Sequence, residues 1–447
     1  MADIAVVGAG WAGLSAALTL VRAGKTVALF EQAPILGGRA RNATWQPRNP
    51  QALDESIAID NGQHLLMGAY SETIALIQSM TGAAAFDALF ERLPVSLRDT
   101  SGFSLIAHRS LPAPLHLAWA LLLAKGLLLS ERLALIRLMA WLHLKQWKIN
   151  PAAMTVSQLL EVTRQPLSLC KKLWHPLCIS ALNTPASIAC AQIFANVLRD
   201  TLGAHRAASD FIVAKVPLGD TLPALVAHEL SASGRCALQT GERVLSISKT
   251  DTGQHCQWQV SSDKKTLDVQ RIVLATPWAI TQSLLGNAGL AIPESDPINQ
   301  LPIYTVYLYF RQSNATARQA PLMLNEDQSK QHFGHWLFDL GATKGGGRLA
   351  SVVISGPGPH QELSRQQIGE AIQRQLAAQT HLTQASEHFV IAEKTATFAC
   401  TAGLVRPIAQ TNDDQIKLCG DFYASPYPAT LETAVRSGLA AARSLIV

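Results

Sequence analysis

The sequence is poor in charge. Only 15% of its 447 residues are Asp, Glu, Lys or Arg, whereas 48% are hydrophobic, a balance that is apolar for a soluble protein. The 37 basic residues exceed the 32 acidic residues by a net charge of +5. Because this excess is small and dispersed along the chain, it gives no indication of a nucleic-acid partner. The composition instead favours an apolar ligand or a membrane surface as the partner.

Cysteines are few and widely spaced. The seven cysteines form no CxxC pair and no Cys/His cluster at the spacing of a zinc site, so we expect no metal. An odd, scattered set is typical of reduced thiols in a cytosolic protein. The N-terminus lacks the basic and apolar segments of a secretory leader, and its first apolar residues fit a strand instead. These features predict cytoplasmic residence.

A long hydrophobic run is missing as well. The most hydrophobic region is residues 111–149. It contains the apolar run Leu115–Leu129, which polar residues and Gly126 interrupt. The run is also shorter than the roughly 20 apolar residues that a membrane span needs. We predict two helices that break near Gly126 or Ser130. The second mixes cations with tryptophans, which is typical of a helix in a bilayer interface; a buried core helix is the alternative.

The first 32 residues hold three closely spaced glycines between two apolar runs. The run Ile4–Val7 predicts a strand, the alanine- and leucine-rich stretch predicts a helix, and Glu31 ends a second strand. In such a unit Gly8 makes the tight turn, Gly10 lets the backbone approach a pyrophosphate, and Gly13 lets the helix pack closely on the strand. Glu31 would bind an adenosine ribose and disfavour a 2′-phosphate. We predict a dinucleotide site, for NAD or FAD, that includes Trp11 and Ala12.

A second glycine pair follows directly. In residues 34–41 two glycines stand beside two arginines, which suits a backbone that passes a phosphate with a guanidinium in reach. The order GxGxxG, acid, GGRA resembles the flavin-containing amine oxidase and phytoene desaturase superfamily. The resemblance implies FAD rather than NAD, and an α/β fold: a Rossmann-like, glutathione-reductase-like FAD-binding domain with an inserted α+β substrate domain. It places along the cofactor Gly37, Gly38, Arg39 and Ala40.

Residues 59–70 read IDNGQHLLMGAY, a strand that ends in a polar turn before a helical pattern. This string resembles one subgroup of the superfamily, the squalene-associated FAD enzymes or hydroxysqualene dehydroxylases of bacterial hopanoid pathways. We expect the loop to face the flavin with Gly62, Gln63 and His64. His64 lies close to Asp60 and Gln63 and is the first candidate for a polar group in the active cavity. A capping or core histidine is the alternative.

Two later segments are predicted to return to the cofactor. Residues 237–277 alternate short strands with polar turns, which predicts a β-meander that closes on an Ala-Thr-Pro turn. Near the C-terminus, CGDFYASPYPATLE at 419–432 leads into the last helix. The superfamily resemblance implies that the N-terminus of this helix points at the flavin, where its dipole would stabilise the reduced form. The superfamily resemblance implies cofactor contacts from Val244, Ala275, Thr276, Gly420, Asp421, Pro428, Thr430 and Leu431.

The length suggests two or three structural units. Alternating strands within 302–384 predict a sheet with a helix packed behind it. Trp336 and Phe338 would line a terpenoid cavity or simply form the core of that sheet. We expect the FAD-binding domain to comprise residues 1–80, 211–300 and 385–447, and the substrate-binding domain residues 81–210 and 301–384.

The subgroup resemblance implies a FAD-dependent hydroxysqualene dehydroxylase, which reduces hydroxysqualene, a C30 isoprenoid, to squalene. The leaving hydroxyl needs a proton donor, for which His64 is the first candidate and Asp339, His335 and Tyr427 are weaker ones. Alternatives are a carotenoid or phytoene-type desaturase and a non-catalytic FAD-bound scaffold for terpenoid enzymes. The expected partners are the substrate, squalene-pathway synthases and the inner face of the cytoplasmic membrane.

Overall fold

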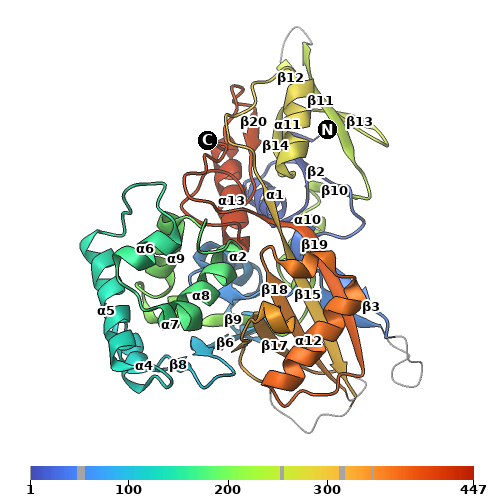
Figure 1. Cartoon of the computed structure of the whole chain (residues 1–447). Coiled ribbons are helices and arrows are strands. Elements are labelled where there is room, and N and C mark those ends of the chain that lie inside the picture. Colours follow the sequence, from blue (N-terminus) through green and yellow to red (C-terminus); the bar gives the residue numbers. More distant parts are fainter. Residues whose placement is uncertain (1, 48–55, 252–255, 312–317, 344–346, 447) are drawn as a thin grey trace.

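The computed structural model of the chain describes residues 2–47, 56–251, 256–311, 318–343 and 347–446. Its N- and C-terminal parts meet in a five-stranded parallel sheet of order β10-β2-β1-β14-β20 (Figure 1). This sheet confirms the predicted α/β class with a Rossmann-like domain. Its strands are β1 (Ile4–Val7), β2 (Val27–Glu31), β10 (Cys236–Thr240), β14 (Arg271–Leu274) and β20 (Ile416–Leu418).

Helix α1 (Trp11–Arg22) packs against α10 (Leu222–Ala232) and α13 (Leu431–Ile446). Two glycines permit this close packing. A Cβ on Gly13 would lie 1.8 Å from the carbonyl oxygen of Gly8, and a Cβ on Gly438 would lie 2.1 Å from that of Ala12. Any side chain at either position would therefore push α1 away from the sheet turn or from α13.

The antiparallel meander is shorter than the sequence predicts. It contains β11 (Val244–Asp251), β12 (Cys256–Ser262) and β13 (Thr266–Val269), and α11 (Trp278–Asn287) follows it. The strands at its two predicted ends, β10 and β14, instead pair in parallel with β2 and β1. The prediction is wrong at these ends because a short buried strand looks the same in either kind of sheet.

A second five-stranded sheet, entirely antiparallel, has the order β16-β17-β18-β15-β19, and α12 (Arg365–Gln379) packs against it. β19 pairs with β15 from Gln300–Phe398 to Tyr309–Glu387. Residues 387–398 therefore belong to this sheet, although the sequence division assigns them to the FAD-binding domain. The other bounds are β15 (Gln300–Phe310), β16 (Leu322–Met323), β17 (Trp336–Ala342), β18 (Arg348–Ser355) and β19 (Glu387–Phe398).

The remaining elements are three small sheets and a group of helices. Three small sheets pair β3 (Asn42–Trp45) with β4 (Ile57–Asp60), β9 (Phe211–Ala214) with β5 (Leu66–Met67) and β6 (Phe90–Leu93), and β7 (Ser96–Arg98) with β8 (Ser104–Ile106). The helices are α2 (Ser71–Thr81), α3 (Ala83–Leu89), α4 (Leu115–Leu123), α5 (Leu129–Leu144), α6 (Val156–Val162), α7 (Leu167–Leu169), α8 (His175–Leu182) and α9 (Ala191–Thr201).

Helices α4 and α5 lie at the outer edge of the molecule, on the side away from β11–β13 (Figure 1). The chain breaks between them at Gly126, whose φ of +71° is readily adopted only by glycine. This confirms the predicted pair of helices. Within the described part of the chain, no helix combines the length and apolarity that crossing a bilayer requires.

Candidate functional site

A cavity of about 1090 Å³ lies between the carboxyl ends of β1, β2 and β14, the antiparallel sheet and the start of α13. All of the predicted cofactor contacts line it except Gly13 and Pro428. Their role in binding a cofactor stays a prediction, but the chain brings them together from five separate segments. They are Gly8, Gly10, Trp11, Ala12, Glu31, Gly37, Gly38, Arg39, Ala40, Gly62, Gln63, His64, Val244, Ala275, Thr276, Gly420, Asp421, Thr430 and Leu431.

One end of the cavity is built to receive a phosphate-containing group. The N-terminus of α1 faces it, and the two glycine turns lie so close that a Cβ on Gly38 would be 3.1 Å from the Cα of Gly10. Trp11 contributes an indole Nε1–H that is buried without a hydrogen-bond partner. A buried donor in the wall of a cavity is satisfied when a ligand supplies an acceptor. These residues therefore fit the pyrophosphate region of FAD.

Glu31 is held in a fixed position at the end of β2. Its two carboxylate oxygens accept hydrogen bonds from the backbone N–H of Ala9 at 2.8 Å and of Ala33 at 2.9 Å. The carboxylate ties the glycine turn to the strand end while it lines the cavity. This arrangement fits the predicted contact with an adenosine ribose.

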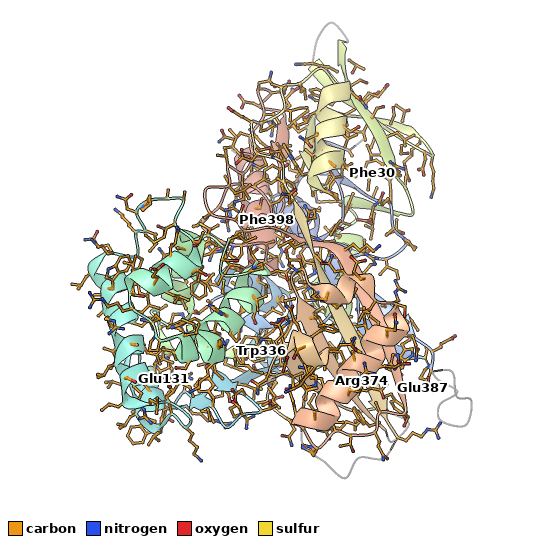
Figure 2. All side chains as sticks on the ribbon, viewed as in Figure 1. Phe30, Glu131, Trp336, Arg374, Glu387 and Phe398 are labelled. Atoms are coloured by element: carbon orange, nitrogen blue, oxygen red, sulfur yellow. The ribbon has the colours of Figure 1, made fainter. Side chains whose placement is uncertain are left out.

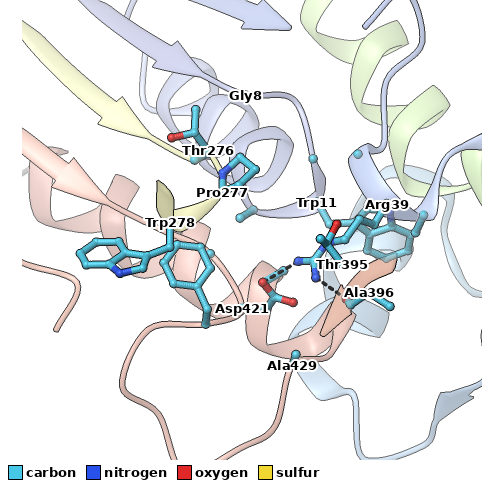
Figure 3. Close-up of a pocket in the computed structure, with 18 of the residues that line it drawn as sticks. Gly8, Trp11, Arg39, Thr276, Pro277, Trp278, Thr395, Ala396, Asp421 and Ala429 are labelled. Atoms are coloured by element: carbon cyan, nitrogen blue, oxygen red, sulfur yellow. Dashed lines mark hydrogen bonds and ion pairs between the residues drawn. The ribbon is translucent and has the colours of Figure 1, made fainter. Parts of the chain in front are cut away.

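An ion pair crosses the cavity between its N-terminal and C-terminal walls. The Arg39 guanidinium lies 2.6 Å from a carboxylate oxygen of Asp421 and also donates to the carbonyl oxygen of Ala396 (Figure 3). The Asp421 charge raises the pKa of Arg39 above its usual value. Arg39 thereby connects the second glycine turn to β19 and to the segment before α13.

The loop after β4 is held from the antiparallel sheet. The Tyr307 hydroxyl donates to the carbonyl oxygen of Asp60 at 2.8 Å, and the backbone N–H of Gln63 donates to the Thr305 hydroxyl at 3.1 Å. The Ser351 hydroxyl donates to the Gln63 side-chain oxygen at 3.2 Å. Three side chains of β15 and β18 therefore fix the position of this loop.

His64 is a neutral imidazole with a defined tautomer. Its Nδ1 lies 2.8 Å from the carbonyl oxygen of Gly62. Because a carbonyl can only accept, Nδ1 carries the proton, and Nε2 of the neutral ring is an acceptor. Burial, together with the charge of Arg39, lowers the pKa of His64 below its usual value. His64 therefore accepts a proton at neutral pH, and it donates one from Nε2 only after protonation.

The other predicted proton donors lie away from this cavity. Asp339 forms an ion pair with Arg348 and accepts hydrogen bonds from the backbone of Gln319 and Gly341. Tyr427 donates its hydroxyl to Asp200 at 2.6 Å. Neither residue is part of the cavity wall, and both are engaged in local contacts. Only His64 among the four candidates lines the cavity.

His335 lines a second cavity of about 700 Å³, which lies between α8, the β16–β17 connection and the end of β18. Its Nε2 lies 3.5 Å from a carboxylate oxygen of Glu326. Trp336 lies where the helical region meets the antiparallel sheet (Figure 2), and its indole donates to Ser180 at 2.6 Å. Trp336 and Phe338 are both buried in the main core, as the alternative interpretation of these residues predicts.

The aromatic part of the first cavity was not predicted from the sequence. Trp278, Phe398 and Phe422 line it, and the rings of Trp278 and Phe422 lie 5.9 Å apart. Trp278 directly follows the Ala-Thr-Pro turn and Phe422 directly follows Gly420-Asp421, so adjacency to each motif was the available signal. Phe398 had no local signal, because β19 reaches the cavity only through its pairing with β15.

The chain is similar in sequence to proteins of known family and function. The model of the family described as flavin containing amine oxidoreductase matches residues 11–446. A hydroxysqualene dehydroxylase of Zymomonas mobilis is 25% identical over 446 residues, covering 98% of this chain and 97% of the relative. A hydroxysqualene dehydroxylase of Rhodopseudomonas palustris is 25% identical over 450 residues, covering 98% and 96%.

Solved structures share the fold. Cyclohexylamine oxidase from Brevibacterium oxydans superposes with a TM-score of 0.64 at 16% identity and covers 100% of this chain and 98% of its own. Wild-type putrescine oxidase bound to putrescine superposes with a TM-score of 0.68 at 14% identity and covers 100% and 99%. The chain therefore shares its overall fold with these solved structures.

Proposed function

The chain belongs to the flavin containing amine oxidoreductase family and is a FAD-dependent oxidoreductase, and from this premise we propose that it reduces hydroxysqualene to squalene. The observation that carries the proposal is the alignment of two hydroxysqualene dehydroxylases over nearly the whole chain. The apolar and aromatic wall beside the motif residues supports it, because a C30 hydrocarbon alcohol needs such a surface.

The reaction replaces a carbon–hydroxyl bond with a carbon–hydrogen bond and releases water, so it consumes one hydride and one proton. When bound in its reduced form, FAD supplies the hydride. The chain must exclude water, orient the alcohol and provide the proton. Trp278 and Phe422 supply an apolar surface for the substrate, and such faces also stabilise developing positive charge on carbon.

We propose that His64 donates the proton to the leaving hydroxyl. Its Nε2 is the atom that would transfer the proton, since Nδ1 is engaged by Gly62. The lowered pKa makes a protonated His64 scarce at neutral pH but a strong acid when it forms. Asp339 and Tyr427 are not assigned a role in this step, because their side chains are engaged elsewhere.

A single anaerobic turnover tests the proposal. The FAD-loaded protein is reduced, hydroxysqualene is added in detergent, and flavin absorbance and extracted product are followed together. We expect flavin reoxidation and squalene formation at the same rate and in equal amounts. A flavin that stays reduced with hydroxysqualene present would refute the dehydroxylase.

A carotenoid or phytoene-type desaturase is the second candidate, and the state of His64 favours it. Desaturation removes a hydride and a proton from the substrate, so it needs a proton acceptor near the cofactor site. The unprotonated Nε2 of neutral His64 is such an acceptor. Bleaching of the oxidised flavin by phytoene, with no response of the reduced flavin to hydroxysqualene, would select this function. If neither hydroxysqualene nor phytoene changes the flavin absorbance, the non-catalytic FAD-bound scaffold is favoured.

The substrate implies where the enzyme works. Hydroxysqualene is a C30 isoprenoid that dissolves in membranes, so we propose that the protein works in the cytoplasm at the inner face of the cytoplasmic membrane. Squalene-pathway synthases would supply the substrate there. Cell fractionation would test this location. A tagged chain should copurify with the membrane fraction, and it should no longer sediment after the lipid is removed.

A further inference from the structure

Helices α4 and α5 carry apolar side chains on the side that faces solvent. Leu122 is 64% exposed, Leu129 is 73% exposed and Leu133 is 55% exposed. A surface helix is normally polar on its outward side, and a contiguous exposed apolar patch marks an interaction site. We name this patch the α4–α5 surface and define it by Trp119, Leu122, Leu123, Leu128, Leu129, Leu133, Ile136 and Leu144.

The pattern along α5 shows that this exposure is regular. Leu129, Leu133, Ile136 and Leu144 are exposed at helical spacing, whereas Leu135, Leu138 and Leu142 are buried in the core. One side of the helix therefore packs on the protein while an apolar stripe remains on the other. The sequence predicted either a core helix or an interfacial helix here. Helix α5 has a buried side typical of the first and an exposed apolar side typical of the second.

The charge around the α4–α5 surface is almost entirely positive. Residues 109–148 contain six basic side chains and one acidic side chain, an excess equal to the +5 of the whole chain. The positive charge is therefore concentrated in this segment, and the expectation of charge dispersed along the chain is wrong. The single acid, Glu131, is buried and paired with Lys172. Lys125, Arg137, Lys145 and Lys148 are exposed.

We propose that the α4–α5 surface docks on an anionic lipid bilayer and lies in its interface. The combination of exposed leucines with surrounding cations matches a helix that inserts its apolar side among acyl chains and keeps its cations at the headgroups. Helix α4 has nine residues, a length of roughly 14 Å, less than half of a bilayer core. Helix α5, with 16 residues, has a length of roughly 24 Å and is also shorter than the bilayer core, so neither helix would cross it.

A second copy of the chain fits this surface poorly. A symmetric dimer would place two patches of the same positive charge against each other, which is unfavourable. An anionic bilayer supplies the opposite charge and the apolar medium together. The proposal rests on the proposed function for its purpose, since a membrane-dissolved substrate must reach the protein from lipid.

The second cavity lies next to the α4–α5 turn. Lys172 lines that cavity, and its Nζ donates to the carbonyl oxygen of Gly126 at 2.9 Å. Arg132 fixes the same turn by donating to the carbonyl oxygens of Leu122 and Ala124. The turn is therefore held by these hydrogen bonds, and docking would bring the second cavity close to the lipid.

Vesicle co-sedimentation of the FAD-loaded full chain tests the docking. Vesicles of phosphatidylcholine alone are compared with vesicles that also contain phosphatidylglycerol. We expect binding to the anionic vesicles that weakens as salt rises. The variant Leu122→Ser/Leu129→Ser should lower the partition coefficient at least about tenfold. The variant Lys125→Gln/Lys145→Gln/Lys148→Gln should lose the preference for anionic lipid.

The matched control is Val405→Ser/Ile408→Ser, which removes two apolar side chains outside the α4–α5 surface that are each 55% exposed. This variant should bind like the unaltered chain. Bound-flavin absorbance confirms folding of each variant. The proposal is overturned if the unaltered chain binds neither vesicle, if Leu122→Ser/Leu129→Ser binds normally, or if the chain is a dimer in solution that this variant dissociates.

Turnover in detergent separates the docking from the proposed function. Dehydroxylation in detergent without vesicle binding would overturn the docking and leave the function in place. Vesicle binding by a chain that does not turn over hydroxysqualene in detergent would support the docking and refute the function.

Discussion

His64 has a fixed tautomer and a lowered pKa, and these determine how the reaction should respond to pH. Dehydroxylation requires the protonated ring, whose population rises as the pH falls toward the lowered pKa. We expect the single-turnover rate to rise about tenfold per unit decrease in pH while the pH remains above that pKa. His64→Gln should be slow and should lose this dependence. Stopped-flow flavin absorbance between pH 6 and pH 8.5 measures both.

A rate that depends on pH in the opposite direction identifies the second candidate function, the desaturase. A desaturase that uses neutral His64 as a base, with the oxidised flavin and a polyene as reactants, should keep a constant rate above the lowered pKa of His64 and lose rate as the pH falls toward that pKa. Retention of flavin by His64→Gln is the control for folding. An unchanged rate in His64→Gln at every pH would remove His64 from either reaction.

Asp60 makes the stability of the fold depend on pH. Burial raises the pKa of Asp60 to about 7, despite a hydrogen bond from the backbone N–H of Leu218. In an unfolded chain the carboxyl has a pKa of about 3.9. Between these values the folded state keeps a proton that the unfolded state has lost, so the free energy of unfolding should fall as the pH rises from about 4 to 7.

Thermal unfolding checks this prediction. Asp60→Asn keeps the acceptor for Leu218 and cannot ionise, so its Tm should depend less on pH across this window and should exceed that of the unaltered chain at pH 8. An equal slope of Tm against pH in both proteins would contradict it.

At the scale of elements, the contact between α1 and α13 depends on a single missing side chain. Gly438→Ala would place a Cβ 2.1 Å from the carbonyl oxygen of Ala12, so the helices must separate. We expect the free energy of unfolding to fall by about 1–3 kcal/mol, together with weaker retention of FAD. Denaturant unfolding and flavin fluorescence measure the two effects.

Gly286→Ala is the matched control within α11. Its new Cβ would meet only the Ile292 side chain, at 3.8 Å. Alanine is the better helix former, so stability should stay equal or rise by up to about 1 kcal/mol. Equal effects of the two substitutions would show that the α1–α13 contact does not limit stability.

At the scale of the whole molecule, both sheets contribute to the wall of the first cavity, where we predict that the cofactor binds. Its wall includes β1, β15, β19 and the start of α13, so bound FAD would contact both halves of the fold. We expect removal of FAD to lower Tm, and readdition to restore it in a concentration-dependent way. At a free FAD concentration of 100 Kd the gain is about 2.7 kcal/mol. A Tm independent of FAD would contradict this coupling.

Part of this organisation was predictable because it is encoded locally. The glycine turn, Glu31 and the Gly420-Asp421 pair are short motifs whose residue types have one physical use, and they all line one cavity. The break at Gly126 was predictable for the same reason. The membership of β19 in the antiparallel sheet was not, since its partner β15 is far away in the sequence.

The glycine-rich strand–helix–strand unit, the FAD-type motifs and the apolar character of α4 and α5 follow from local sequence alone, because each depends on neighbouring residues. Only the tertiary structure decided which polar groups share the cavity and which are engaged elsewhere. It paired Asp339 with Arg348 and Tyr427 with Asp200, and it left His64 in the cavity wall. It also decided that leucines of α5 face outward. Burial and pairing depend on contacts between distant segments, which no local pattern records.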